Sequence, residues 1–174
     1  MQQVTDIQQF WFAARVRHSQ EFAVRDTLLK FDIICYVPTH IVVRELKYRR
    51  VQVEVPVISN LIFVYATKER ACAAANDFGI PLYYMQDAST HAMLVIPDKQ
   101  MDDFRFVMEH GADEVTIDDA AMVAGDKVLV MKGDFSGVRG EMVRISSHTH
   151  VLIRIPQILS AVVRVPKSYL KIEK

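Results

Sequence analysis

The chain has 174 residues, 51% hydrophobic and 24% charged, the composition of an ordinary soluble globular protein able to bury a core. No apolar run approaches the roughly 20 residues that a membrane-spanning helix needs, and no basic segment followed by an apolar one opens the chain. We therefore expect no membrane contact and no secretory signal. Cys35 and Cys72 lie far apart without metal-ligand spacing, so we expect reduced thiols in a cytoplasmic protein.

The net charge is zero but is unevenly distributed. Residues 1–110 carry 12 bases and 13 acids, residues 111–122 four acids and no base, and residues 123–174 nine bases and four acids. This pattern predicts a domain at 1–110, an acidic linker at 111–122 and a basic domain at 123–174. One continuous domain with an acidic loop is the alternative. The linker's acids are read as solvated chain and not as a metal site: Asp113, Glu114, Asp118 and Asp119.

The first elements alternate between strand and helix. Phe10–Val16 is rich in aromatic and β-branched residues, which predicts a strand. Ser19 is a plausible N-cap for a helix over residues 20–31. Residues 33–43 predict a second strand, in which Pro38 must occupy an edge position or a bulge.

A polar hairpin tip at residues 44–50 leads into the longest strand pattern of the chain. Residues 51–57 alternate between valine and polar residues, as in a strand with one buried face. After a predicted bulge at 56–60, residues 61–65 are apolar on both faces, which is typical of a central strand. Helices should cover one face of this strand. The element or partner that covers its other face is the functional question.

The remaining elements of the first domain are two helices and two short strands. Thr67 is suited to cap a helix over residues 68–77, and Gly79 to follow that helix. Short strands are expected at 83–84 and 91–96, and Pro97 should open a helix with an apolar face. The first domain is thus α+β, a largely antiparallel sheet with helices packed on it. The apolar face of its last helix comprises Met101, Phe104, Val107 and Met108.

The pattern after the linker consists of short strands alone. Gly and Pro separate five of them, at residues 128–131, 138–145, 151–155, 161–165 and 169–172. Such tight spacing predicts a small five-stranded β-barrel. Glycines 133 and 137 permit turn conformations that residues with a Cβ disfavour.

Two segments make the chain resemble the NusG family of transcription elongation factors. Residues 125–130 (GDKVLV) and 133–141 (GDFSGVRGE) are similar to the family's KOW motif, which implies an SH3-like barrel. Trp11 opening a strand and residues 56–64 (PVISNLIFV) resemble the N-terminal domain, whose stretch reads roughly Pro-Leu-Phe-Pro-Gly/Asn-Tyr-Leu-Phe-Val. The departures at Ile58, Ser59 and Leu61 suggest a specialised paralog, similar to the Bacteroides-type capsule-locus antiterminators.

The resemblance implies contacts with RNA polymerase. The β′ clamp helices would dock on Ile58, Leu61 and Phe63, with Trp11 a further candidate, although an apolar run is equally an ordinary core. Arg70 aligns near the family's contact to the β-subunit gate loop. A loop containing Phe135, Gly137 and Gly140 would face ribosomal protein S10 or the termination factor Rho, with Phe135 either exposed there or tucked over the barrel end.

Basic residues at two places are candidates for nucleic-acid binding. A helix N-terminus with adjacent bases attracts anions, and the family uses this region against the non-template DNA strand. The hairpin tip carries further basic residues around Tyr48, whose ring could stack on a nucleobase. Solvated surface charge is the alternative for both. The candidates are Arg15, Arg17, His18 and Gln20 in the first group, and Arg44, Lys47, Arg49 and Arg50 in the second.

No motif for catalysis or for a cofactor stands out. His148 and His150 lack a third ligand, and phosphate-binding loops, nucleophile elbows and paired carboxylates are missing. The sequence therefore predicts a monomeric, non-enzymatic factor that binds elongating RNA polymerase and suppresses pausing and termination, with operon specificity. The alternatives are a general NusG-type factor that couples polymerase to Rho or the ribosome, and a ribosome-associated RNA-binding protein.

Overall fold

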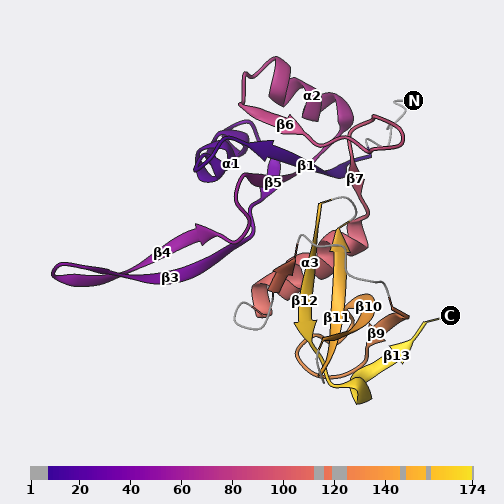
Figure 1. The fold of residues 1–174 in the computed structure, drawn as a ribbon. Helices are drawn as coiled ribbons and strands as arrows, with labels where there is room; N and C mark the ends of the chain where they lie inside the picture. Colours follow the sequence, from indigo (N-terminus) through magenta and orange to yellow (C-terminus); the bar gives the residue numbers. More distant parts are fainter. Residues whose placement is uncertain (1–7, 112–115, 119–124, 146–147, 156–157, 174) are drawn as a thin grey trace, which may run out of the picture. The chain divides into compact units, whose positions relative to one another are not determined.

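The computed structural model describes residues 8–111, 116–118, 125–145, 148–155 and 158–173 (Figure 1). Its contacts divide the chain into two compact units, Met1–Pro97 and Asp98–Lys174, here called unit 1 and unit 2. In the part of the chain described, no helix has the length and apolar character needed to cross a membrane.

Unit 1 is built on an antiparallel sheet in the strand order β2-β5-β1-β6, with β7 also paired to β1. The central pair joins β1 to β5, so that Phe12 lies opposite Val64 and Ala13 opposite Phe63. The predictions of a first strand at Phe10–Val16 and of a buried strand after residue 60 are confirmed. The strands are β1 (Phe10–Val16), β2 (Ile34–Tyr36), β5 (Leu61–Ala66), β6 (Leu82–Tyr84) and β7 (Val95–Ile96).

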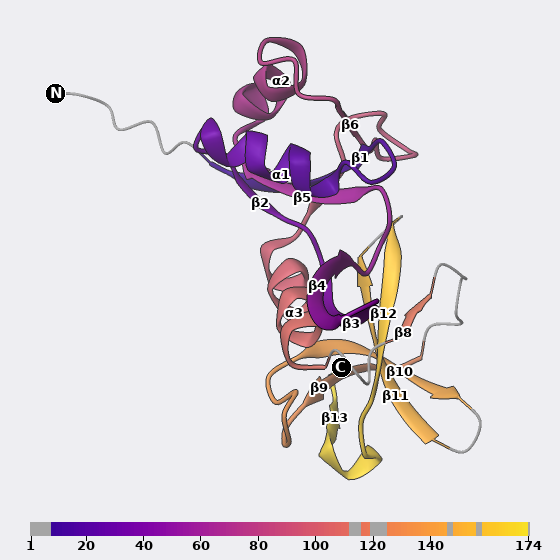
Figure 2. The same ribbon diagram turned by 90° about the vertical axis from the view of Figure 1, so that its left-hand side faces the viewer.

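Helices α1 (Glu21–Lys30) and α2 (Lys68–Asn76) cover the same face of this sheet (Figures 1 and 2). Their apolar residues and those of alternate positions on β1 and β5 form one buried cluster. The cluster is typical of a sheet face packed beneath helices. Its members include Phe12, Ala14, Val16, Val24, Leu28, Ile62, Val64, Ala66, Ala71 and Ala74.

The helix ends follow local rules in two cases of three. The Thr67 side chain accepts a hydrogen bond from the Arg70 amide at 3.2 Å, so the predicted N-cap of α2 is confirmed. Gly79 has a φ of +64°, the left-handed conformation expected after α2. The prediction that Ser19 caps α1 is wrong. Gln20 is the N-cap residue, without a side-chain capping bond, because Ser19 has a φ of +60° inside a tight turn.

Strands β3 (Thr39–Leu46) and β4 (Arg49–Pro56) form a separate two-stranded hairpin that projects from the unit 1 sheet (Figure 1). The single strand expected over residues 33–43 is therefore split into β2 and β3 around Pro38. Pro38 has no N–H to donate, and its carbonyl accepts from the Val57 amide at 2.8 Å. The valines of β4 alternate with exposed residues as predicted, but they are only half-buried, because a two-stranded hairpin has little to pack against.

Unit 2 combines α3 (Asp98–His110), which begins directly after Pro97, with a six-stranded antiparallel sheet in the order β13-β9-β10-β11-β12-β8. All five strands predicted here are present. The sixth, β8, pairs with β12 and lies inside the segment expected to be a linker. Asp113, Glu114 and Asp119 fall outside the described residues. The strands are β8 (Thr116–Asp118), β9 (Lys127–Val130), β10 (Arg139–Ile145), β11 (His148–Ile155), β12 (Leu159–Arg164) and β13 (Leu170–Ile172).

Candidate functional site

The sheet of unit 1 has an apolar face opposite the α1–α2 cluster, which we call the second face. The strand register places Trp11, Ala13, Tyr36, Leu61, Phe63, Tyr65 and Ile96 on it. Aromatic rings pair across the strands: the centroids of Trp11 and Tyr65 are 5.0 Å apart, and those of Tyr36 and Phe63 are 6.3 Å apart. The face therefore presents large aromatic and aliphatic side chains of the kind found at protein–protein interfaces.

Three of the four predicted clamp-helix contacts lie on this face and are buried. Leu61 and Phe63 are 0% exposed and Trp11 is 6% exposed, whereas Ile58, at the end of the hairpin, is half-buried. This burial is what the alternative interpretation, an ordinary core, requires. Binding of a partner by these residues stays a prediction.

The kink between β4 and β5 is held by a buried carboxylate. Asn60 has a φ of +64°, and its amide donates to Glu21 Oε1 at 2.7 Å, while its carbonyl accepts from the Val16 amide at 3.0 Å. Glu21 is only 3% exposed and stands at the first position of α1. Glu21 was not predicted as a functional residue, although an acid in the first turn of a helix is a recognisable signal. Glu21 thus fixes the position of the segment that contains Ile58.

Replacing Glu21 with alanine is expected to lower the free energy of unfolding by about 1–3 kcal/mol, because the Asn60 amide would lose its acceptor in a partly buried site. Chemical denaturation followed by the fluorescence of Trp11, the single tryptophan, reports on unit 1 directly. Glu21→Gln keeps an acceptor oxygen and should cost less than the alanine variant. Equal stability of the alanine variant and the wild type would contradict the assignment.

The first group of predicted nucleic-acid contacts is gathered at one end of β1. Arg15, Arg17, His18 and Gln20 are all exposed. A hydrogen bond from the Gln20 amide to the Arg17 carbonyl, 3.1 Å long, closes the turn that carries them. Among the described residues no carboxylate forms an ion pair with Arg15 or Arg17, so both guanidinium groups are available for phosphate oxygens.

The second group lies at the tip of the β3–β4 hairpin. Arg44, Lys47, Arg49 and Arg50 are exposed there, and Arg50 pairs with Glu45 at 2.8 Å. Tyr48 is 88% exposed, with the Lys47 ammonium 5.5 Å from its ring centroid. The tip therefore combines positive charge with a solvent-facing ring. Its basic residues lie on the paired strands as well as in the turn.

Arg70 has a structural partner. Its guanidinium donates to the carbonyl of Phe31, which follows the last residue of α1. Phe31 stacks on Phe78 with centroids 4.4 Å apart, so these contacts tie the ends of α1 and α2 together. Arg70 remains exposed, and its predicted contact with the polymerase gate loop stays a prediction.

The predicted partner loop of unit 2 is a tight turn. Gly133 and Gly137 have φ values of +84° and +92°, which confirms that glycine is needed there. Phe135 is only 7% exposed, so of its two alternatives the structure shows the packed one. At Gly140, in β10, a Cβ would lie 2.6 Å from the Leu152 carbonyl oxygen, which explains a glycine in the middle of a strand.

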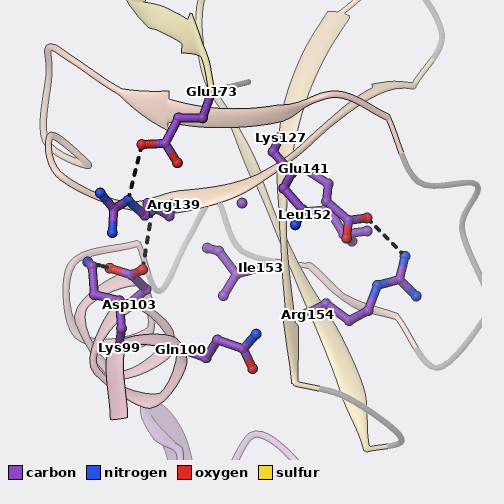
Figure 3. Close-up of a pocket in the computed structure, with 11 residues that line it drawn as sticks. Lys99, Gln100, Asp103, Lys127, Arg139, Glu141, Leu152, Ile153, Arg154 and Glu173 are labelled. Atoms are coloured by element: carbon purple, nitrogen blue, oxygen red, sulfur yellow. Dashed lines mark hydrogen bonds and ion pairs between the residues drawn. The ribbon is translucent and has the colours of Figure 1, made fainter. Parts of the chain in front are cut away.

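A surface pocket of about 300 Å³ lies between α3 and the sheet within unit 2 (Figure 3). Asp103, 5% exposed, accepts from the Lys99 ammonium and, at 3.3 Å, from the Arg139 backbone amide. Arg139 also pairs with Glu173 at 3.3 Å. Asp103 was not predicted from the sequence, although a Lys–Asp pair at i,i+4 beside the apolar residues of a helix is a recognisable signal. Six charged side chains that line the pocket form three ion pairs, Lys99–Asp103, Arg139–Glu173 and Arg154–Glu141, whereas the buried Gln100 Oε1 has no hydrogen-bond partner in the described part of the chain.

Within the described ranges, no group of three or more potential metal ligands is found, and His150 Nδ1 lies 3.2 Å from the His148 carbonyl oxygen. Cys35 and Cys72 are free thiols. Burial raises the pKa of Cys35 to about 11, so its reactive thiolate form is scarce at neutral pH.

Comparison with protein families places these features in context. The family model described as "Transcription termination factor nusG" matches residues 9–105. The chain belongs to the NusG family. Its members are transcription factors. The match covers the whole unit 1 sheet, including the second face and both basic groups, together with part of α3.

Two solved structures resemble the chain only distantly. One, titled "Domain interaction in Thermotoga maritima NusG", is 15% identical over 96% of this chain and 98% of that chain, with a TM-score of 0.45. Another, the MjSpt4:Spt5 complex in conformation A, is 13% identical over 94% of this chain and 98% of that chain, with a TM-score of 0.30. A search of curated proteins finds no match. Membership of the NusG family therefore rests on the family model.

Proposed function

We propose that this NusG-family protein is an elongation factor that binds RNA polymerase and suppresses pausing and termination on particular operons. The observation that carries the proposal is the family match over residues 9–105, because it spans the sheet whose second face is apolar. A factor that bridges the polymerase cleft would restrain opening of the clamp and so disfavour paused states.

The second face, together with Ile58 at the end of the hairpin, is the proposed docking surface for the β′ clamp helices. Ile58, Leu61, Phe63 and Trp11 would contact the helix pair, and burial of apolar area supplies about 25 cal/mol per Å². Since Leu61 and Phe63 are fully buried, docking requires a rearrangement that exposes them, whereas Ile58 is already half-exposed. Ile58 is therefore the residue through which the docking proposal is best tested.

The two basic groups are proposed to contact nucleic acid, with the end of β1 facing the non-template DNA strand. Their exposure and the lack of ion pairs to Arg15 and Arg17 among the described residues support this assignment. Arg70 would contact the β gate loop beside its bond to Phe31. The strands of unit 2 would form a KOW-type, SH3-like barrel whose loop at residues 132–137 meets ribosomal protein S10 or Rho.

Ile58→Asp is expected to weaken binding to purified RNA polymerase by about tenfold, or about 1.4 kcal/mol, because a charge would enter the apolar contact. Leu29→Asp is the matched control. Leu29 is 53% exposed on α1, which covers the opposite face of the sheet, so this variant should bind like the wild type. Wild-type affinity of Ile58→Asp, with an unchanged unfolding transition, would remove the docking assignment.

One observation favours a second function. Residues 123–174 carry nine bases and four acids, an excess that would suit a ribosome-associated RNA-binding protein. That function predicts salt-sensitive binding of the full chain to ribosomal RNA and no affinity for polymerase. Mapping the protein along the genome separates the remaining choices, because an operon-specific factor occupies one locus and a general factor occupies all transcribed loci.

A further inference from the structure

Tyr83 occupies a position that the proposed function does not use. It is the middle residue of β6, the edge strand of the unit 1 sheet. Its neighbour Tyr84 points into the α1–α2 cluster, where its ring lies 5.9 Å from that of Phe12. Since side chains alternate along a strand, Tyr83 points to the second face, and it is 63% exposed there.

The residue directly opposite Tyr83 is the basic residue Arg15. The register of β1 and β6 pairs Arg15 with Tyr83, and such cross-strand neighbours have Cβ atoms about 4.5–5.5 Å apart on the same face. Arg15 is exposed, and Arg17 and His18 follow at the end of the same strand. The exposed ring of Tyr83 thus adjoins the Arg15 side chain, and neither Arg15 nor Arg17 makes an ion pair among the described residues.

We propose that Tyr83 is a stacking platform for an unpaired base of a single nucleic-acid strand, whose phosphates are held by Arg15 and Arg17. An aromatic face accepts any base, whereas a guanidinium group binds phosphate, so together they match a single strand in which bases and backbone are both accessible. A duplex hides its base faces and offers the ring nothing to stack on. The inference rests on the proposed nucleic-acid contact at the end of β1 and adds a base-stacking residue to it.

The test is fluorescence anisotropy of the full chain with oligothymidylate, oligouridylate and a duplex over a range of salt concentrations. Tyr83→Ala should weaken single-strand binding by about 5- to 150-fold, while Tyr83→Phe, which keeps the ring, should stay within about twofold of the wild type. The slope of log K against log salt should not change in either variant. Arg15→Ala with Arg17→Ala should instead reduce that slope by about 1.4. Leu29→Ala, exposed on α1, controls for the loss of a surface side chain.

The outcomes separate the two proposals. If the arginine variant loses affinity and salt dependence but Tyr83→Ala binds like the wild type, the stacking platform is wrong and the nucleic-acid surface stands. If the wild type binds none of the three probes, both are wrong. Equal losses on duplex and single strand, or a Tyr83→Phe variant as weak as Tyr83→Ala, also overturn base stacking. The ratio of oligothymidylate to oligouridylate affinity identifies DNA or RNA as the strand bound.

Discussion

Replacing Phe63 with alanine is expected to lower the free energy of unfolding by about 3–5 kcal/mol. Phe63 is 0% exposed on the central strand β5, and its ring lies 6.3 Å from that of Tyr36. The substitution would leave a cavity in a packed region, which costs more than the lost transfer energy alone. Denaturant unfolding followed by Trp11 fluorescence measures the loss.

Ile34→Ala is the matched control for this prediction. Ile34 lies on the same face, on β2, but is 55% exposed, so its truncation should cost less than about 1 kcal/mol. A loss at Phe63 as small as that at Ile34 would contradict its placement in the core. The same burial makes Leu61 and Phe63 unsuitable for testing polymerase binding. A charge at either residue would unfold the sheet as well as disturb docking, so Ile58 is the cleaner probe.

Replacing Asp103 with alanine should destabilise the contact between α3 and the sheet of unit 2 by about 2–3 kcal/mol. Asp103 bridges the Lys99 ammonium and the Arg139 backbone amide, and hydrogen bonds to a charged group contribute about 1.5–3 kcal/mol (Figure 3). Removing the carboxylate leaves that amide without its acceptor. Native-state hydrogen exchange should show faster exchange of the Arg139 amide and of the α3 amides.

The neighbouring acid provides the control for Asp103. Asp102 is exposed on the same helix, so Asp102→Ala should leave the exchange rates of β10 unchanged. Asp103→Asn keeps an acceptor for the Arg139 amide but loses the attraction to Lys99, so its effect should fall between those of alanine and the wild type. Unchanged exchange in Asp103→Ala would show that the apolar side of α3 alone holds it against β11.

Features that depend on a few neighbouring residues could be predicted from the sequence. Apolar and β-branched content located β1 and β5, and the Gly and Pro residues between short apolar runs located the five strands of unit 2, because these signals lie within a few residues of each strand. Thr67 and Gly79 were correctly placed at the ends of α2, since caps form within one turn of chain. The same locality explains the failure at Ser19, where the turn leading into α1 decided its conformation.

The family could also be predicted from the sequence, because a continuous stretch, residues 56–64, carries much of the resemblance to its N-terminal domain. Trp11 and residues 56–64 lie within the range that the family model matches. The residue contacts proposed for polymerase and nucleic acid come from that resemblance and remain to be tested. The local sequence pattern could not show which arginine and lysine side chains lack an ion pair, since ion pairing depends on residues that are distant in the sequence.

Most helices and strands of this protein, and its family, thus follow from local sequence. Which residues are accessible depends on tertiary packing. Packing buries Leu61, Phe63 and Phe135. It also brings the carboxylates of Glu21 and Asp103 to the backbone amides of Asn60 and Arg139, and places Tyr83 opposite Arg15. The physical reason is that propensity and periodicity act over a few residues, whereas burial and pairing are set by groups that meet across strands from far apart in the chain.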